Sequence, residues 1–254
     1  MTQFSANLGF LWTDLALPDA IRAAKAAGFA AVECHWPYAF ATVDVKAALD
    51  ETGLPMLGLN TNRGDVVGGD NGLSALPDRI DQAQAAIDEA IAYAVAIDCS
   101  ALHVMAGFAS GAAAHDCFVA NLKYAADKAA QHDVTIQIEP LNHYDAPGYF
   151  LSTTTQAITI IDDVGAANLK LMFDCYHVQL MEGDLSHRIE KLLAHIGHIQ
   201  FAGVPARGRP DEGEVAYANL FKTIANLGYT KPLGAEYKPG GNTDGTLGWM
   251  SQYR

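Results

Sequence analysis

The feature that most constrains the fold of this sequence is a regular alternation of short apolar segments with longer segments of helical periodicity. Runs rich in β-branched and other apolar residues recur along the chain, and apolar residues repeat every three or four positions in the stretches between them. The pattern predicts eight strands and seven helices, with a Gly-rich C-terminal tail in the position of an eighth helix. This rhythm within 254 residues is typical of a single-domain (β/α)8 barrel, the TIM barrel, spanning residues 1–254.

The predicted elements follow one another without a linker that would divide the chain. Strands are expected over residues 4–10, 30–34, 54–59, 101–105, 134–138, 169–173, 196–201 and 232–236. Helices are expected over residues 17–27, 43–51, 77–97, 113–132, 153–164, 185–194 and 215–227. A doubly wound open sheet is the competing architecture. It usually carries a Gly-rich phosphate-binding turn after its first strand, and the segment ANLGFLW has no G-x-G-x-x-G.

Charge and composition restrict the partners and the compartment. A net charge of -13 repels a phosphate backbone and so disfavours nucleic acid as a partner. The first residues lack the basic and apolar parts of a signal peptide, and no apolar run approaches the ~20 residues of a membrane span. We expect a soluble, cytoplasmic protein, and a homo-oligomer remains open. The four cysteines are widely spaced, which favours reduced thiols in the core over disulfides or zinc.

Four polar residues fall at the C-terminal ends of the last four predicted strands. They are Glu139, Asp174, Gln200 and Glu236, spaced about 30 residues apart, the length of one strand–helix unit. Because these strand ends face one mouth of a closed barrel, the four side chains are expected to converge. Close carboxylates raise each other's pKa unless a cation neutralises them. A hard divalent ion suits three carboxylates and one amide oxygen, so the sequence predicts a Mg2+ site, with Mn2+ as the alternative and zinc disfavoured.

Several other residues are expected near the same mouth. His177 lies three residues after Asp174, a spacing that lets the aspartate reach the ion while the histidine, in the following loop, faces the substrate. The loop cations Arg207, Lys238 and Arg63 could each hold a substrate carboxylate. His103, inside the fourth strand, is interpreted as a core histidine.

With these residues in view, the chain resembles the hydroxypyruvate isomerase family of xylose isomerase-like barrels, which includes the 2-oxo-tetronate isomerases. The similarity covers nearly the whole chain and is most specific in ANLGFLW, AAVECHWPY, LNTNRGD, HVMAG, IEPLN, FDCYHVQ, HIQFAGVPARGRPDEGE and GAEYKP. The sequence departs from the family pattern at Asn62 and in its short, Gly-rich tail. Both differences lie at the mouth of the expected pocket and bear on the choice of substrate.

The resemblance implies a role for each matching position. Glu139 and Glu236 match two glutamates that bind metal and move protons, and Asp174 and Gln200 match the other two ligands. His177 and Arg207 match residues that face the substrate, and Lys238 is a weaker match.

The implied reaction converts hydroxypyruvate and tartronate semialdehyde into each other through an enediolate, with the two glutamates as acid and base. A 2-oxo-tetronate isomerase or a ketose 3-epimerase on the same site is an alternative, and epimerases of this superfamily usually have histidine where Gln200 stands. A non-catalytic barrel that binds a sugar acid and a repair endonuclease with a histidine-rich zinc site are more distant alternatives.

Overall fold

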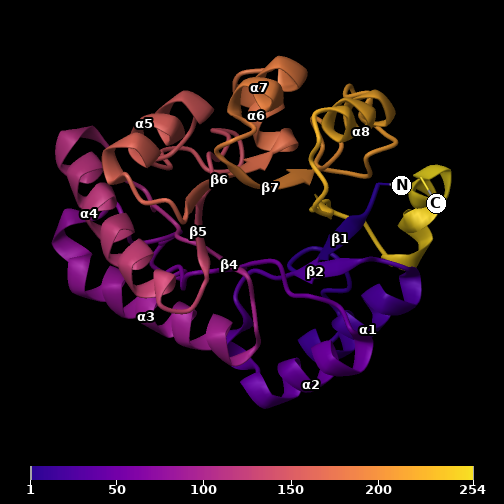
Figure 1. The fold of residues 1–254 in the computed structure, drawn as a ribbon, viewed down its shortest axis with the longest axis horizontal. Coiled ribbons are helices and arrows are strands. Elements are labelled where there is room, and N and C mark those ends of the chain that lie inside the picture. The colour runs from indigo at the N-terminus through magenta and orange to yellow at the C-terminus, as the bar shows by residue number, and fades with distance from the viewer. Residues whose placement is uncertain (1, 254) are drawn as a thin grey trace.

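The strands of the computed structural model, which describes residues 2–253, form one parallel eight-stranded sheet that curves into a barrel (Figure 1). Their order is β2-β1-β8-β7-β6-β5-β4-β3. The strands are β1 (Phe4–Asn7), β2 (Ala31–Glu33), β3 (Leu59–Asn60), β4 (Ala101–His103), β5 (Thr135–Ile138), β6 (Leu169–Asp174), β7 (Ile196–Phe201) and β8 (Leu233–Ala235). The prediction of a TIM barrel is therefore confirmed.

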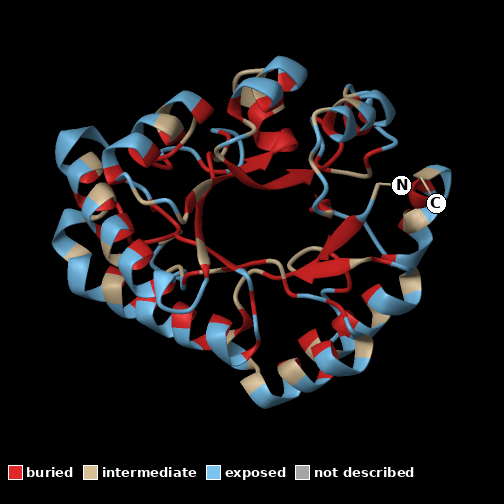
Figure 2. Cartoon of the chain, viewed as in Figure 1, coloured by how far each residue is buried: buried red, intermediate tan, exposed pale blue. Residues whose placement is uncertain are grey.

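The helices surround the barrel and bury one face each, as the red inner and blue outer surfaces in Figure 2 show. The α-helices are α1 (Leu17–Ala27), α2 (Thr42–Thr52), α3 (Ile80–Ala96), α4 (Gly111–Ala130), α5 (Thr154–Val164), α6 (Cys175–Met181), α7 (Leu185–Leu192) and α8 (Tyr217–Asn226). Three 3-10 helices are η1 (Pro37–Ala39), η2 (Pro77–Arg79) and η3 (Asp244–Tyr253). In the described range 2–253, no helix combines the length and apolar character needed to cross a membrane.

Local sequence signals explain where these helices begin and end. In α1, Pro18 occupies the first turn, where a missing backbone N–H leaves no hydrogen bond unmade. The helix ends at Gly28, whose φ of 89° is readily adopted by glycine and strained for other residues. The hydroxyl of Thr153 accepts a hydrogen bond from the Gln156 N–H and caps α5.

The structure corrects the predicted third strand. Residues 54–59 were expected to form a strand, but β3 contains only Leu59–Asn60. The segment meets β2 through a single bridge between Val32 and Met56, beyond which the pairing shifts by one residue. Backbone hydrogen bonds such as Cys34 N–H to Gly58 O (3.0 Å) continue the contact. The barrel is therefore nearly closed, with an irregular seam between β2 and β3.

One further detail differs from the prediction, and the position of the tail agrees with it. Residues 175–181 form the short helix α6, so His177 lies in a helix and not in a loop. The C-terminal tail takes the place of an eighth helix as η3, where Trp249 and Tyr253 pack their rings against Phe4 of β1.

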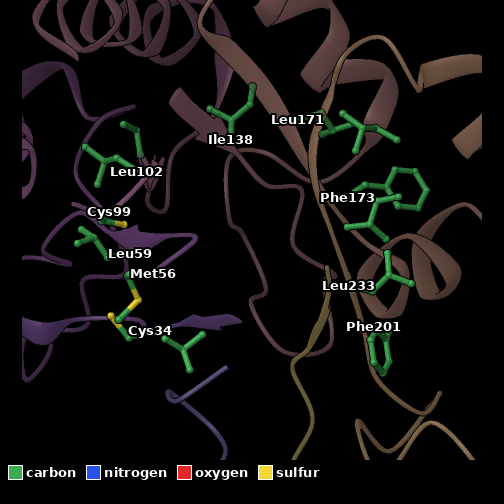
Figure 3. Close-up of a cluster of buried hydrophobic side chains, with 14 of the residues drawn as sticks. Cys34, Met56, Leu59, Cys99, Leu102, Ile138, Leu171, Phe173, Phe201 and Leu233 are labelled. Atoms are coloured by element: carbon green, nitrogen blue, oxygen red, sulfur yellow. The ribbon is translucent and has the colours of Figure 1, made fainter. Parts of the chain in front are cut away.

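Apolar side chains fill the layer between the strands and the helices. Figure 3 shows part of this core, in which the sulfur-containing side chains of Cys34, Met56 and Cys99 gather beside Leu59. All four cysteines are free and buried, which confirms the prediction that they act as small core residues.

The interior of the barrel, in contrast, is lined with polar side chains. Ser5 on β1, Glu33 on β2, and His198 and Gln200 on β7 are buried and contact one another across the barrel. Strand residues two positions apart point to the same side, so the polar and apolar faces alternate along β7. Hydrogen-bonded polar side chains therefore line this part of the barrel interior.

Candidate active site

The four predicted strand-end residues converge at one mouth of the barrel. Asp174 of β6 pairs with Gln200 of β7. Gln200 in turn pairs with Gly234 of β8, and Glu236 stands two residues after that glycine. Glu139 follows the last residue of β5 directly. All four side chains are buried, from 0% exposed for Asp174 to 6% for Glu139. Each of the four residues lies at the C-terminal end of its strand or directly beside it, and their chemical roles belong to the proposal below.

Two oxygens of this group have no hydrogen-bond partner. Glu139 Oε1 and Gln200 Oε1 are both buried and unpaired. A buried acceptor without a partner costs about 1–3 kcal/mol, so such groups call for a ligand. An oxygen of Glu139, an oxygen of Asp174 and a ring nitrogen of His177 lie within 4.8 Å of one another. An oxygen-rich, negatively charged set of this kind fits a hard divalent ion such as Mg2+ or Mn2+.

Arg207 supplies the positive charge that balances these carboxylates. Its Nη2 lies 2.6 Å from Glu236 Oε2 and 3.4 Å from Asp174 Oδ2, and its Nη1 lies 3.6 Å from Asp145. The guanidinium also stacks on the rings of Phe10 and Tyr176. An ion bound to Asp174 and Glu236 would therefore compete with Arg207 for the same oxygens.

The backbone of Arg207 is held in an unusual conformation. Its φ of 55° lies in the left-handed region, which costs a non-glycine residue about 1–3 kcal/mol. The turn is closed by a hydrogen bond from Gly203 N–H to Gly208 O (2.7 Å), and Lys238 N–H donates to Arg207 O (2.7 Å). These contacts fix the backbone of Arg207 beside the site.

The environment separates the pKa values of the three carboxyl groups. Burial, reinforced by the charges of Glu236 and Asp174, raises the pKa of Glu139 well above its ordinary value. Burial and Glu236 likewise raise the pKa of Asp174. Burial acts in the same direction on Glu236, but the Arg207 charge and the hydrogen bond from His35 outweigh it and lower the pKa of Glu236. Glu236 is thus ionised, while Glu139 and Asp174 tend to keep a proton unless a cation is near.

His177 presents a single proton to the site. Its Nδ1 accepts a hydrogen bond from the Asn142 backbone N–H (2.9 Å), so the neutral ring carries its proton on Nε2. That Nε2–H faces Asp174 Oδ2 at 3.6 Å and Glu139 Oε1 at 3.9 Å. Burial, with a contribution from Arg207, lowers the pKa of His177 to about 3, so the ring is neutral. In this tautomer His177 is a donor and not a metal ligand.

Asp174 connects the site to the helix that carries His177. Its Oδ1 accepts a hydrogen bond from the Tyr176 N–H (2.9 Å) and caps α6, while its Oδ2 faces the site.

Two predicted substrate-binding cations lie farther out. Lys238 is exposed at the rim. Arg63 is half-buried and stacks on Trp36, with its guanidinium carbon 3.7 Å from the ring centre. The structure therefore brings Arg207 and His177 to the carboxylates and leaves Arg63 and Lys238 at the periphery.

The sequence analysis missed several residues of the site. Asn7 Nδ2 and His35 Nε2 each lie 2.9 Å from Glu236 Oε1 and hold that carboxylate in place. His103 was interpreted as a satisfied core histidine, but neither of its ring nitrogens has a hydrogen-bond partner. Its Nδ1 lies 3.6 Å from Glu139 Oε2, which places His103 in the site. The available signal was its position at the C-terminal end of β4, the same end that carries the acids.

Comparisons with known proteins agree with this architecture. The family model described as xylose isomerase-like TIM barrel matches residues 21–253. A 2-oxo-tetronate isomerase from Cupriavidus necator is 43% identical over 100% of this chain and 99% of its own length. The hydroxypyruvate isomerase of Escherichia coli is 39% identical, with all of both chains covered. The chain therefore belongs to the xylose isomerase-like TIM barrel family. Within it, the full-length relatives place the chain in the hydroxypyruvate isomerase group.

Solved structures show the same fold. A Brucella melitensis protein described as an AP endonuclease of family 2 superimposes with a TM-score of 0.96, at 37% identity and full coverage of both chains. A 3-keto-D-glucoside 4-epimerase from E. coli has a TM-score of 0.82 at 19% identity, with 99% of each chain covered. The second likeness concerns the fold alone.

Proposed function

We propose that the protein is a metal-assisted aldose–ketose type isomerase of a small 2-oxo acid, with hydroxypyruvate and tartronate semialdehyde as the interconverted pair. The observation that carries the proposal is the group of three buried carboxylates and one unpaired amide oxygen on consecutive strands. The full-length relatives named as isomerases support the same reaction type. The relative at 43% identity makes a four-carbon 2-oxo-tetronate the second candidate substrate.

Glu139, Asp174, Gln200 and Glu236 would hold the divalent ion. When bound, the ion supplies a positive charge that stabilises the negative charge developing on the substrate oxygens. One of the two glutamates removes the carbon-bound proton to give the enediolate, and the other returns a proton to the neighbouring carbon. The hydroxyl proton moves between the two substrate oxygens, so that the former carbonyl becomes the hydroxyl. In the metal-free protein the pKa of Glu139 is raised and that of Glu236 is lowered, so the two glutamates lie in different electrostatic environments.

The remaining residues bind and orient the substrate. The neutral His177 would donate its Nε2–H to a substrate oxygen, and the guanidinium of Arg207 would bind the substrate carboxylate. Arg63 and Lys238 would complete the positive rim as the substrate enters.

The other readings have less support. An endonuclease on this fold needs a histidine-rich multinuclear zinc site, and the potential ligand cluster found in residues 2–253 contains one histidine. The net charge of -13 also opposes binding to DNA. The epimerases among the solved structures share the fold at less than 25% identity and say nothing about the substrate.

Proton NMR on metal-replenished protein tests the proposal with hydroxypyruvate, 2-oxo-tetronates and free ketoses as substrates. We expect turnover of a 2-oxo acid, loss of activity with EDTA and recovery with Mg2+ or Mn2+. Solvent deuterium should enter the product. Turnover of ketoses alone would favour an epimerase. Full retention of the substrate hydrogen in the product would indicate a hydride shift and exclude the enediolate.

A further inference from the structure

A further buried carboxylate, that of Glu33, contacts one of the four strand-end residues. Glu33, at the end of β2, is 3% exposed and has no role in the reaction proposed above. Its Oε2 accepts a hydrogen bond from Gln200 Nε2 (2.9 Å) and lies 3.0 Å from His198 Nε2. Its Oε1 accepts a hydrogen bond from the Ser5 hydroxyl (3.1 Å). Residues of two strands, β1 and β7, therefore fix both oxygens of Glu33.

This arrangement determines which way the amide of Gln200 points. A side-chain amide has an oxygen on one side and an NH2 group on the other, and an ionised carboxylate can only accept hydrogen bonds. With its Nε2 bonded to Glu33, Gln200 must turn its Oε1 away, and that Oε1 is the buried oxygen without a partner. The flipped amide would set two acceptors against each other and present NH2 to a cation.

The neighbouring strand leaves space for this contact. A Cβ added to Gly234 of β8 would lie 2.3 Å from Glu33 Oε1, 2.8 Å from Gln200 Cγ and 2.8 Å from His198 Nε2. Any side chain at this position would separate the groups that meet there. The glycine, the carboxylate and the amide thus form one local arrangement.

We propose that Glu33 is a positioning residue that orients the Gln200 amide so that its oxygen serves as a metal ligand. The inference rests on the proposed metal site, and it adds a residue that acts through Gln200 and does not touch the ion. Outer groups of this kind typically change metal affinity by about 10- to 100-fold when they are removed.

The test measures Mn2+ affinity by electron paramagnetic resonance, which requires no turnover. Glu33→Met removes the acceptor, so we expect Mn2+ binding about 10- to 100-fold weaker than in the wild type. Glu33→Gln removes the charge but keeps an oxygen that can accept from Gln200, while its NH2 can donate to Ser5. This variant should bind Mn2+ within about threefold of the wild type. In a Gln200→Met background, Glu33→Met should have little further effect.

Each alternative outcome contradicts a different statement. Equal losses in Glu33→Met and Glu33→Gln would show that Glu33 acts through its charge, and unchanged affinity in Glu33→Met would show that it does not act on the ligand. Either result overturns the proposal and leaves the metal site intact. No Mn2+ binding by the wild type would refute the metal site itself, and this proposal with it.

A measurement on wild-type protein decides the matter if Glu33→Met does not fold. With selective 15N-glutamine labelling, the Gln200 side-chain NH2 signal can be assigned from its loss in Gln200→Glu. Because this NH2 is bonded to Glu33 inside the barrel, it should exchange slowly with solvent both before and after Mg2+ is added. Fast exchange in the Mg2+-loaded protein would overturn the proposal.

Discussion

Replacing Arg207 by methionine should strongly destabilise the protein when no metal is present. Arg207 is 8% exposed, and its guanidinium lies against the carboxylates of Glu236, Asp174 and Asp145. Methionine retains much of the apolar contact with the neighbouring rings but leaves the buried carboxylates without a counter-charge. Removing one partner of a buried ion pair typically costs about 3–5 kcal/mol. For a chain of this size, that loss corresponds to a Tm lower by about 6–20 °C.

Thermal unfolding in EDTA and in Mg2+ tests this reasoning, with Arg209→Met as the matched control. Arg209 lies two residues away in the same loop, but its ion pairs with Asp211 and Glu212 are partly exposed, so its loss should cost about 1 kcal/mol or less. Because a divalent ion neutralises the same carboxylates as Arg207, Mg2+ should restore much of the lost Tm in Arg207→Met and raise that of Arg209→Met less. Equal, small Tm changes in both variants would refute the argument that Arg207 balances the buried charge.

Three further predictions concern catalysis, substrate binding and pH. Glu139→Gln and Glu236→Gln should each lower kcat by at least about 100-fold with native circular dichroism, and near-normal turnover would remove that residue from the chemistry. Arg63→Met should raise KM for the oxo acid and leave the Mn2+ affinity unchanged. The same kinetic assay on Lys238→Met should show a smaller rise in KM because Lys238 is exposed. An unchanged KM in either variant would exclude the replaced residue from substrate binding. Folding raises the pKa of Glu139 and Asp174, so metal-free protein should lose stability as the pH rises above about 4.5, the ordinary value for Glu. Since protons compete with the ion for these oxygens, calorimetry should show tighter Mg2+ binding at pH 8 than at pH 6, and the reverse order would contradict the shifts.

The barrel and the four strand-end residues could be predicted because each rests on a local and repeated signal. Apolar segments alternate with helical periodicity, and an acid or amide at a strand end has only one mouth to face in a closed parallel barrel. The prediction of residues 54–59 as a strand was wrong because apolar composition does not reveal a shift in pairing. Leu57 N–H donates to Val32 O, but Cys34 N–H bonds to Gly58 O, one residue beyond its regular partner.

The hydrogen-bonded polar side chains inside the barrel were harder to predict. Glu33 and His198 lie within short apolar strands, and nothing in either segment indicates that their side chains meet. Their contact depends on the order of strands around the barrel, which brings β2 and β7 close across β1 and β8. The weak signal was the spacing of two between Ser5 and Asn7, and between His198 and Gln200, which marks one face of each strand. The helix α6 was missed because seven residues are too few for an apolar period.

The two oxygens of Asp174 have separate duties, and this affects how its variants should be interpreted. Alanine would remove both the cap of α6 and a proposed ligand of the ion, so an inactive protein would not reveal which loss mattered. Asparagine can still hold the Tyr176 N–H through its carbonyl while withdrawing the negative charge. Comparing the two substitutions separates the effect of the capping hydrogen bond from the effect of the negative charge. It also shows whether His177 keeps its position when the charge is removed.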